Sequence, residues 1–142
     1  MRRYLLDTPL LAAYLQGRRA AVELITPWVE GDEVVTSILA YGEVVEYLKD
    51  HANFSTRHSQ LLDLLNEVVE PYFLSYEILE RYADIRRQLR PPHGAGLIGD
   101  IDTLIAATAL EHGLTVVSSD EDFQRVPGLQ VMLIPRAALR AR

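Results

Sequence analysis

The stretch "GDIDTLIAATALEHGLTVVSSDEDF", residues Gly99 to Phe123, decides the fold because its apolar middle has carboxylates at both ends. Its pattern predicts a helix over Ile101–His112, with Gly113 as the helix C-cap, and then a strand over "LTVVSS". A helix of about 12 residues is ~18 Å long. The strand returns over roughly 13 to 17 Å, so the two elements have nearly the same length.

The acids of this stretch therefore converge. Because the helix and the strand run antiparallel around Gly113, Asp102 at the helix start returns beside Asp120 and Asp122 at the strand end. Each of these acids also has a purely structural reading. Asp102 at a helix start is favoured by the helix dipole, and Asp100 is a plausible helix N-cap. The acids after the strand are compatible with a solvated turn.

The remaining chain alternates short β-rich runs with longer helical stretches, which predicts one α/β domain with a central parallel β-sheet flanked by helices on both sides. We expect a single domain over residues 1–142, with its core at about 3–134 and a short C-terminal tail at 135–142. Ligands bind such sheets beyond the carboxyl ends of the strands. The other expected strands are 3–7, 34–37, 72–75 and 129–134. Thr8 is expected to cap a helix whose first position is Pro9. The remaining helices are expected over 18–30 (restarting at Thr26-Pro27), 38–51, 56–70 (ended by Pro71) and 77–89.

Asp7 and Glu43 are expected at the same edge of the sheet. Asp7 ends the first strand, and Glu43 lies in the early turns of the helix that follows "VVTS". Each like-charge pair at ~4 Å costs about 4 kcal/mol at an effective dielectric of 20, so a divalent cation is needed to hold such acids together. Oxygen ligands suit Mg2+ or Mn2+, and such an ion can activate water to cleave a phosphodiester.

Composition limits the possible functions. The chain has 142 residues, of which 49% are apolar, enough for one substantial core. It has no cysteine, which excludes disulfides, thiolate nucleophiles and sulfur-ligated zinc. A net charge of −6 argues against a general nucleic-acid coat protein, although not against a nuclease. We expect a cytoplasmic protein with no membrane contact, because no long uncharged window or secretory signal is present.

Four stretches of the chain carry a family resemblance. "YLLDTPLL", "TSILAYGEVVEYL", "IGDIDTLIAATALEHGLTVVSSDEDF" and "VPGLQV" resemble, in order and spacing, the PIN-domain ribonucleases and in particular VapC-type toxins. The likeness covers about residues 3–134. Its most specific part is Asp102 with "LIAATAL" and "VSSDEDF".

The resemblance implies a Mg2+- or Mn2+-dependent endoribonuclease, the toxin of a type II toxin-antitoxin system. It implies a VapB-like antitoxin as partner and a homodimer. Carried over to this sequence, the resemblance implies an acidic quartet that binds the metal, formed by Asp7, Glu43, Asp102 and Asp120. It also implies an auxiliary acid and two small hydroxyl side chains beside the site, which are Asp122, Thr8 and Ser118. Pro9 is a departure, because the family usually has Asn at this position.

Pro9 leaves a second function open, a catalytically impaired PIN-fold module that binds or regulates protein partners. A phosphoacceptor receiver domain is disfavoured, since Lys49, the only lysine, lies mid-chain on a predicted helix. An aspartyl phosphatase is disfavoured because Pro9 stands where a second Asp is needed. The arginines at 81, 86, 87 and 90 are expected to pair with Glu77, Glu80 and Asp84 on their own helix rather than to form an RNA track.

Overall fold

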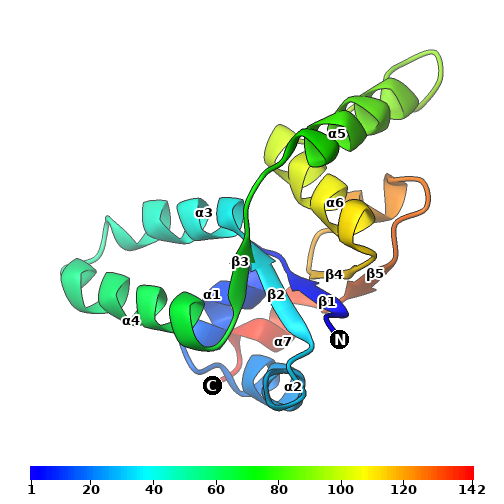
Figure 1. Cartoon of the computed structure of the whole chain (residues 1–142). Coiled ribbons are helices and arrows are strands. Elements are labelled where there is room, and N and C mark those ends of the chain that lie inside the picture. Colours follow the sequence, from blue (N-terminus) through cyan, green and yellow to red (C-terminus); the bar gives the residue numbers. More distant parts are fainter.

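A computed structural model describes residues 1–142 and contains one five-stranded parallel sheet. The strand order is β3-β2-β1-β4-β5, so that β1 lies at the centre (Figure 1). All four strand pairs are parallel, which confirms the predicted α/β sheet. The strands are β1 (Tyr4–Leu6), β2 (Val34–Ser37), β3 (Glu70–Tyr72), β4 (Thr115–Ser118) and β5 (Val131–Leu133).

Helices connect the strands, close to the positions that the sequence predicts. They are α1 (Thr8–Leu15), α2 (Arg19–Glu30), α3 (Ile38–Leu48), α4 (Phe54–Glu67), α5 (Tyr76–Leu89), α6 (Asp100–His112) and α7 (Arg136–Arg140), with a 3-10 helix η1 (Glu121–Arg125). Gly113 ends α6 with a φ of 66°, the left-handed conformation that glycine adopts easily and that the C-cap prediction requires.

Two proline predictions are wrong. The helix α2 continues through Pro27 without a restart, because Ala21 and Ile25 pack on the sheet and hold it in place. Pro71 does not end α4, which stops at Glu67; it lies inside β3 instead of before it. An edge strand accepts proline because one side of its backbone has no partner strand, and β3 is an edge of this sheet.

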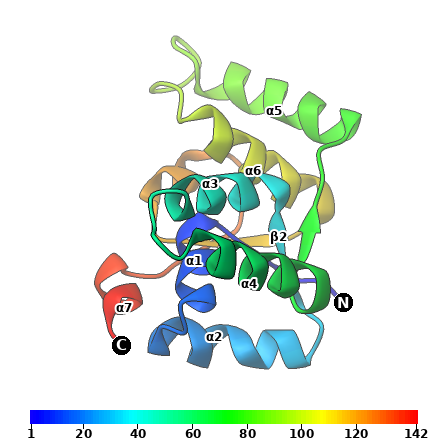
Figure 2. The same ribbon diagram turned by 90° about the vertical axis from the view of Figure 1, so that its left-hand side faces the viewer.

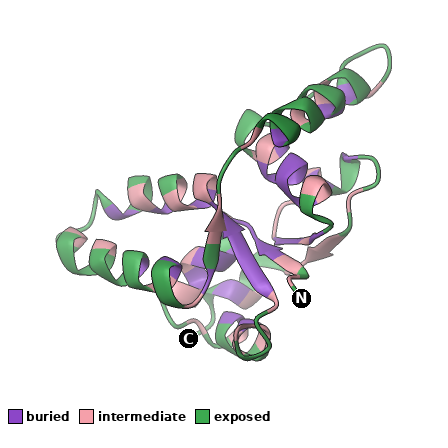
Figure 3. Ribbon diagram, in the orientation of Figure 1, coloured by how far each residue is buried: buried purple, intermediate pink, exposed green.

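The sheet separates two apolar cores because neighbouring strand residues point to opposite faces. Leu5, Val35 and Val116 pack in one core with α5, α6 and Phe123 of η1. The residues Leu6 and Val117 face the other core, which α1, α2 and α7 complete. The three inner strands β1, β2 and β4 are almost completely buried, whereas α4 and α5 expose their outer sides (Figure 3). Helices therefore cover both faces, as predicted.

A third core joins α1 to the pair α3 and α4. Leu11 of α1 packs there with Val44 and Leu61, all of them fully or almost fully buried. In Figure 2, α3 lies above α1 and α4, which are level with each other, and α2 lies below them, while α7 stands at the edge beside α1. Helix α1 therefore has one side in each of two cores, which fixes the position of its first turn.

The segment 135–142, expected as a tail beyond the core, includes α7. Leu139 of this helix is buried in the core of α1 and α2. On the same face, Trp28 of α2 stacks on Tyr4 of β1 with ring centroids 3.9 Å apart. Among the helices of the structure, none has the length and apolar character that crossing a membrane requires.

Candidate active site

A pocket lies beyond the carboxyl ends of β1 and β4, with a volume of about 430 Å³. In parallel sheets this edge, where connections leave to opposite sides, is the usual place for ligands. The structure brings all four acids of the predicted quartet to its wall. The polar lining comprises Asp7, Glu43, Asp102 and Asp120 with Thr8, Gln16, Tyr47 and Arg136.

Asp7 directly follows β1, and only 3% of its surface is exposed. Its Oδ2 accepts a hydrogen bond of 2.6 Å from the hydroxyl of Ser118, at the end of β4. Burial raises the pKa of the Asp7 carboxyl above its usual range, and the Ser118 hydrogen bond lowers it only partly. The charges of Glu43 and Asp120 raise it further. A buried acid of this kind is costly without a cation.

Glu43 reaches the pocket from α3. The hydroxyl of Thr8 donates to its Oε1 at 2.5 Å, which joins the first turn of α1 to α3. Thr8 is not the cap of α1 that the sequence suggests; it is the first helical residue, and Asp7 occupies the N-cap position. The position of Glu43 follows from the start of α3, where the Ser37 hydroxyl accepts a hydrogen bond from the Leu39 backbone.

Asp102 lies in the first turn of α6 and faces the other acids. Its pKa is raised to about 7, first by burial and then by the charges of Asp7, Asp120 and Glu43. Asp120 follows β4; its backbone N–H donates to Ser118 Oγ at 3.0 Å, and its carboxylate caps η1 by accepting from the Asp122 N–H at 2.9 Å. Ser118 therefore orients two of the acids.

Asp122 and Asp100, which belong to the same stretch, lie outside the pocket. Asp122 is within η1, where it forms an ion pair of 3.7 Å with Arg125. Asp100 is not an N-cap, since Gly99 holds that position; it pairs with Arg86 at 2.7 Å. Because η1 starts at Glu121, the chain turns immediately after Asp120 and carries Asp122 away from the pocket lining.

The arginines of α5 also differ from expectation. Instead of pairing along their own helix, Arg81 contacts Glu111 at 2.7 Å and Arg86 contacts Asp100 at the same distance. Both partners belong to α6, which packs against α5. Arg81 and Arg86 therefore join two helices.

Arg136 is a pocket residue that the sequence pattern does not single out. It begins α7, three positions after β5 ends at Leu133, and lines the pocket with the acids. The rule that ligands bind beyond the carboxyl ends of parallel strands applies to β5 as well as to β1 and β4. That rule could have identified Arg136 from the sequence. The residue is missed because residues 135–142 are expected to form a tail beyond the core.

The acids are suited to a hydrated divalent ion. No three His, Asp or Glu side chains are arranged to hold one metal ion between them. Mg2+ usually keeps several of its waters and contacts one or two carboxylates, so an enclosed cage is not required. Burial raises the pKa of Asp7 and of Asp102, and the charges of neighbouring acids raise both further. A bound cation would offset this repulsion.

Comparisons with known proteins agree with this architecture. The sequence matches the PIN domain family over residues 4–129, and the chain belongs to this family. No curated protein gives a significant match.

Solved structures with the same fold come from several bacteria. VapBC from Salmonella typhimurium, solved bound to DNA, gives a TM-score of 0.82 at 18% identity, covering 93% of this chain and 98% of that one. VapBC2 from Rickettsia felis, bound to a DNA fragment from its promoter, gives a TM-score of 0.80 at 19% identity, covering 92% of this chain and 98% of that one. VapBC-5 from Mycobacterium tuberculosis, described as a member of the VapBC family of toxin-antitoxin systems, gives a TM-score of 0.66 at 19% identity. The match covers 95% of this chain and 99% of that one. At these identities the likeness establishes the fold.

Proposed function

We propose that this PIN-domain chain is a divalent-metal-dependent endoribonuclease that hydrolyses RNA phosphodiester bonds. The observation that carries the proposal is the convergence of Asp7, Glu43, Asp102 and Asp120 in one pocket, where none of them forms an ion pair. Acids elsewhere in the chain do pair with arginine. Burial and the charges of neighbouring acids raise the pKa of Asp7 and of Asp102. Unpaired acids with such raised pKa values are typical of a functional site.

Asp7, Glu43, Asp102 and Asp120 would hold Mg2+ or Mn2+, directly or through water. Such an ion, when bound, would activate water and neutralise charge on the scissile phosphate.

The chain's own residues order this site. Ser118 holds the Asp7 carboxylate and the Asp120 backbone, while Thr8 holds Glu43. Arg136 lines the same pocket and supplies a cation that could contact a phosphate oxygen. Single-stranded RNA suits such a pocket, because its backbone and bases are accessible in a way that those of duplex RNA are not.

We further propose that the chain is the toxin of a type II toxin-antitoxin pair, with a VapB-like antitoxin partner and a homodimeric form. The support is its similarity in fold to VapBC proteins from several bacteria. Expression of the chain in a bacterial host should stop growth, and expression of Asp102→Asn should not. Normal growth with the wild-type chain accumulating as folded protein would argue against a toxin.

The enzymatic proposal is tested by measuring Mn2+ binding by calorimetry and cleavage of a mixed structured-RNA pool by the same protein. We expect wild type to bind Mn2+ and cut RNA only with the metal present, and Asp102→Asn to lose the cutting. Asp84→Asn is the matched control, because Asp84 is an exposed acid of α5 outside every ion pair of the structure. Equal cleavage by wild type and Asp102→Asn would contradict the assignment.

The alternative of a partner-binding module without catalysis rests on Pro9, which lies in the first turn of α1 and lines the pocket. Proline has no side-chain group to order a ligand or water at this position. The same experiment separates the two functions. A chain that neither binds Mn2+ nor cuts RNA, while remaining folded, would favour the module.

A further inference from the structure

A second cavity adjoins the acidic pocket and has the opposite charge. Its volume is about 640 Å³, and Ala12, Gln16, Val44 and Tyr47 line both cavities. The remaining polar wall of the second cavity carries cationic groups and no Asp or Glu. We call it the basic cavity; its charged or titratable residues are Arg18, Arg57, Arg142 and His51.

The two cavities are the ends of one groove, because α1 and α3 lie side by side and continue in the same direction from the acids. Residues four apart lie on one face of a helix, about one turn along. On α3, Tyr47 follows Glu43 by one turn, and His51 lies just beyond the helix end. On α1, Ala12 follows Thr8 in the same way. Both helices therefore lead from the acidic pocket to the basic cavity.

The cations of the basic cavity have no acidic partners. Arg18 bonds to the Gln16 side chain and to the Arg140 carbonyl oxygen, and Arg57 takes part in no ion pair. Elsewhere Arg81, Arg86 and Arg125 each pair with an acid. In a chain with a net charge of −6, a cavity with unpaired cations and no acids is a selective place for an anion.

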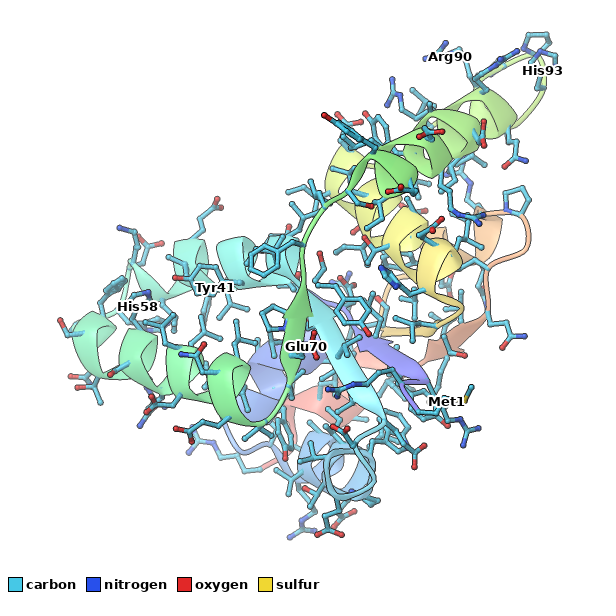
Figure 4. The ribbon with its side chains drawn as sticks, in the orientation of Figure 1. Met1, Tyr41, His58, Glu70, Arg90 and His93 are labelled. Carbon is cyan, nitrogen blue, oxygen red and sulfur yellow. The ribbon has the colours of Figure 1, made fainter.

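The wall that carries Arg57 is braced in place. Its neighbour His58 forms a hydrogen bond of 3.0 Å with the Tyr41 hydroxyl, between α4 and α3, and stacks on Phe54. Figure 4 shows Tyr41 and His58 on these two adjacent helices. Tyr47, half-exposed at 52%, stands where the two cavities join and touches His51 with its ring centroids 4.8 Å apart.

We propose that the basic cavity binds phosphodiester groups of the single-stranded RNA next to the bond held at the acidic pocket, with Tyr47 stacking on an intervening base. This inference rests on the proposed function, since it assigns the path of that enzyme's substrate. A strand with one phosphate at the acids has neighbouring phosphates along the groove, where the cations lie. A half-exposed aromatic ring beside cations is a sequence-tolerant platform for single strands.

The test measures the binding of a short, mixed-sequence, single-stranded RNA oligonucleotide by fluorescence anisotropy at several salt concentrations. The Asp102→Asn protein is used so that the probe is not cut. Adding Arg57→Ala should weaken binding severalfold and reduce the slope of log Kd against log salt by about 0.7, the value for one lost phosphate contact. Tyr47→Ala should weaken binding severalfold while leaving that slope unchanged.

Arg90→Ala is the matched control, because it removes the same charge at the tip of α5, far from α3 and α4 (Figure 4). We expect it to bind RNA like the parent protein. Equal effects of Arg57→Ala and Arg90→Ala would overturn the inference, because RNA binding would then depend only on the overall charge of the protein.

Two further outcomes separate this inference from others. Polyglutamate serves as a probe of an acidic protein segment; if Arg57→Ala weakens its binding and leaves RNA binding unchanged, the cavity takes a protein partner and the inference is wrong. If the wild-type chain cuts no RNA with Mn2+, yet Arg57→Ala still weakens RNA binding selectively, the nuclease proposal fails and the strand-binding cavity stands.

Discussion

Helix α6 begins with two acids, Asp100 and Asp102, that meet opposite surroundings. Asp100 turns to α5, where Arg86 lies at 2.7 Å and the Tyr82 hydroxyl donates to the same oxygen at 3.1 Å. Asp102 turns to the sheet edge, where its neighbours are other acids and its pKa is raised to about 7, mainly by burial. The residues around an acid, rather than its position in the sequence, therefore decide whether its role is structural or chemical.

The same contrast applies to the two regions as a whole. At the contact of α5 and α6, charges of opposite sign meet on an exposed surface, where such pairs contribute roughly 0 to 1 kcal/mol. At the acidic pocket, four acids are gathered and partly buried, and none of them forms an ion pair. The first region joins two helices at little energetic cost, whereas the second brings like charges together at a cost in stability.

The strongest test of the contrast exchanges each α6 acid for its amide. We expect Asp102→Asn to lower metal-dependent RNA cleavage by about a hundredfold or more, because a lost ion contact removes several kcal/mol of transition-state stabilisation. Asp100→Asn should stay within about twofold of wild type. Cleavage rates at saturating Mn2+ measure both, and similar losses in the two variants would remove the distinction.

Removing the hydroxyl that orients the acids should have the next largest effect. Ser118→Ala removes the side-chain hydrogen bond to the Asp7 carboxylate and frees the Asp120 backbone N–H. Loss of such an orienting group typically lowers metal affinity or activity by about 10- to 100-fold.

Ser119→Ala is its neighbouring control, because the buried Ser119 hydroxyl has no hydrogen-bond partner in the structure. Calorimetric Mn2+ affinity compares the two variants. Equal affinity in both would show that Ser118 does not order the site.

The pH dependence of stability sharpens the contrast without any catalytic assay. Without metal, the pKa of Asp102 rises from an ordinary 3.8 to about 7, so the folded state favours its protonated form. The stability that it contributes is complete below about pH 4 and is lost as the pH rises through about 7. Metal-free wild type should therefore lose a few degrees of Tm over this range relative to Asp102→Asn.

Thermal unfolding of both proteins in a chelator, from pH 4 to 8, gives this difference directly. Added Mn2+ should restore wild-type Tm at pH 7 and have little effect on the variant. A constant difference between the two Tm values across the pH range would show that Asp102 has an ordinary pKa.

The smallest effect is expected at the ion pair between Arg86 of α5 and Asp100 of α6. Arg86→Ala breaks the ion pair with Asp100 and should cost about 1 kcal/mol or less in unfolding free energy. Cleavage should not change. Urea unfolding in low and high salt measures the cost, which should shrink as salt screens the pair. A large loss of activity would mean that the α5–α6 contact positions Asp102.

Most of the fold is predictable because its signals are local. Short β-rich runs indicate β1, β2 and β4, and Gly113 marks the end of α6. The convergence of the four acids follows from the rule about strand ends together with the antiparallel return of β4 beside α6. What the sequence does not reveal depends on contacts between distant segments: packing that carries α2 through Pro27, the turn at η1 that removes Asp122 from the pocket, and the return of Arg136 to it.

The stacking of Trp28 on Tyr4 gives this molecule an optical reporter. Trp28 is the only tryptophan, so its fluorescence comes from a single place, where α2 meets the central strand β1. This strand leads directly into Asp7, yet the indole lies outside the residues that line the acidic pocket. Its emission should change when β1 separates from α2 on unfolding and stay nearly constant while a cation binds without moving the strand.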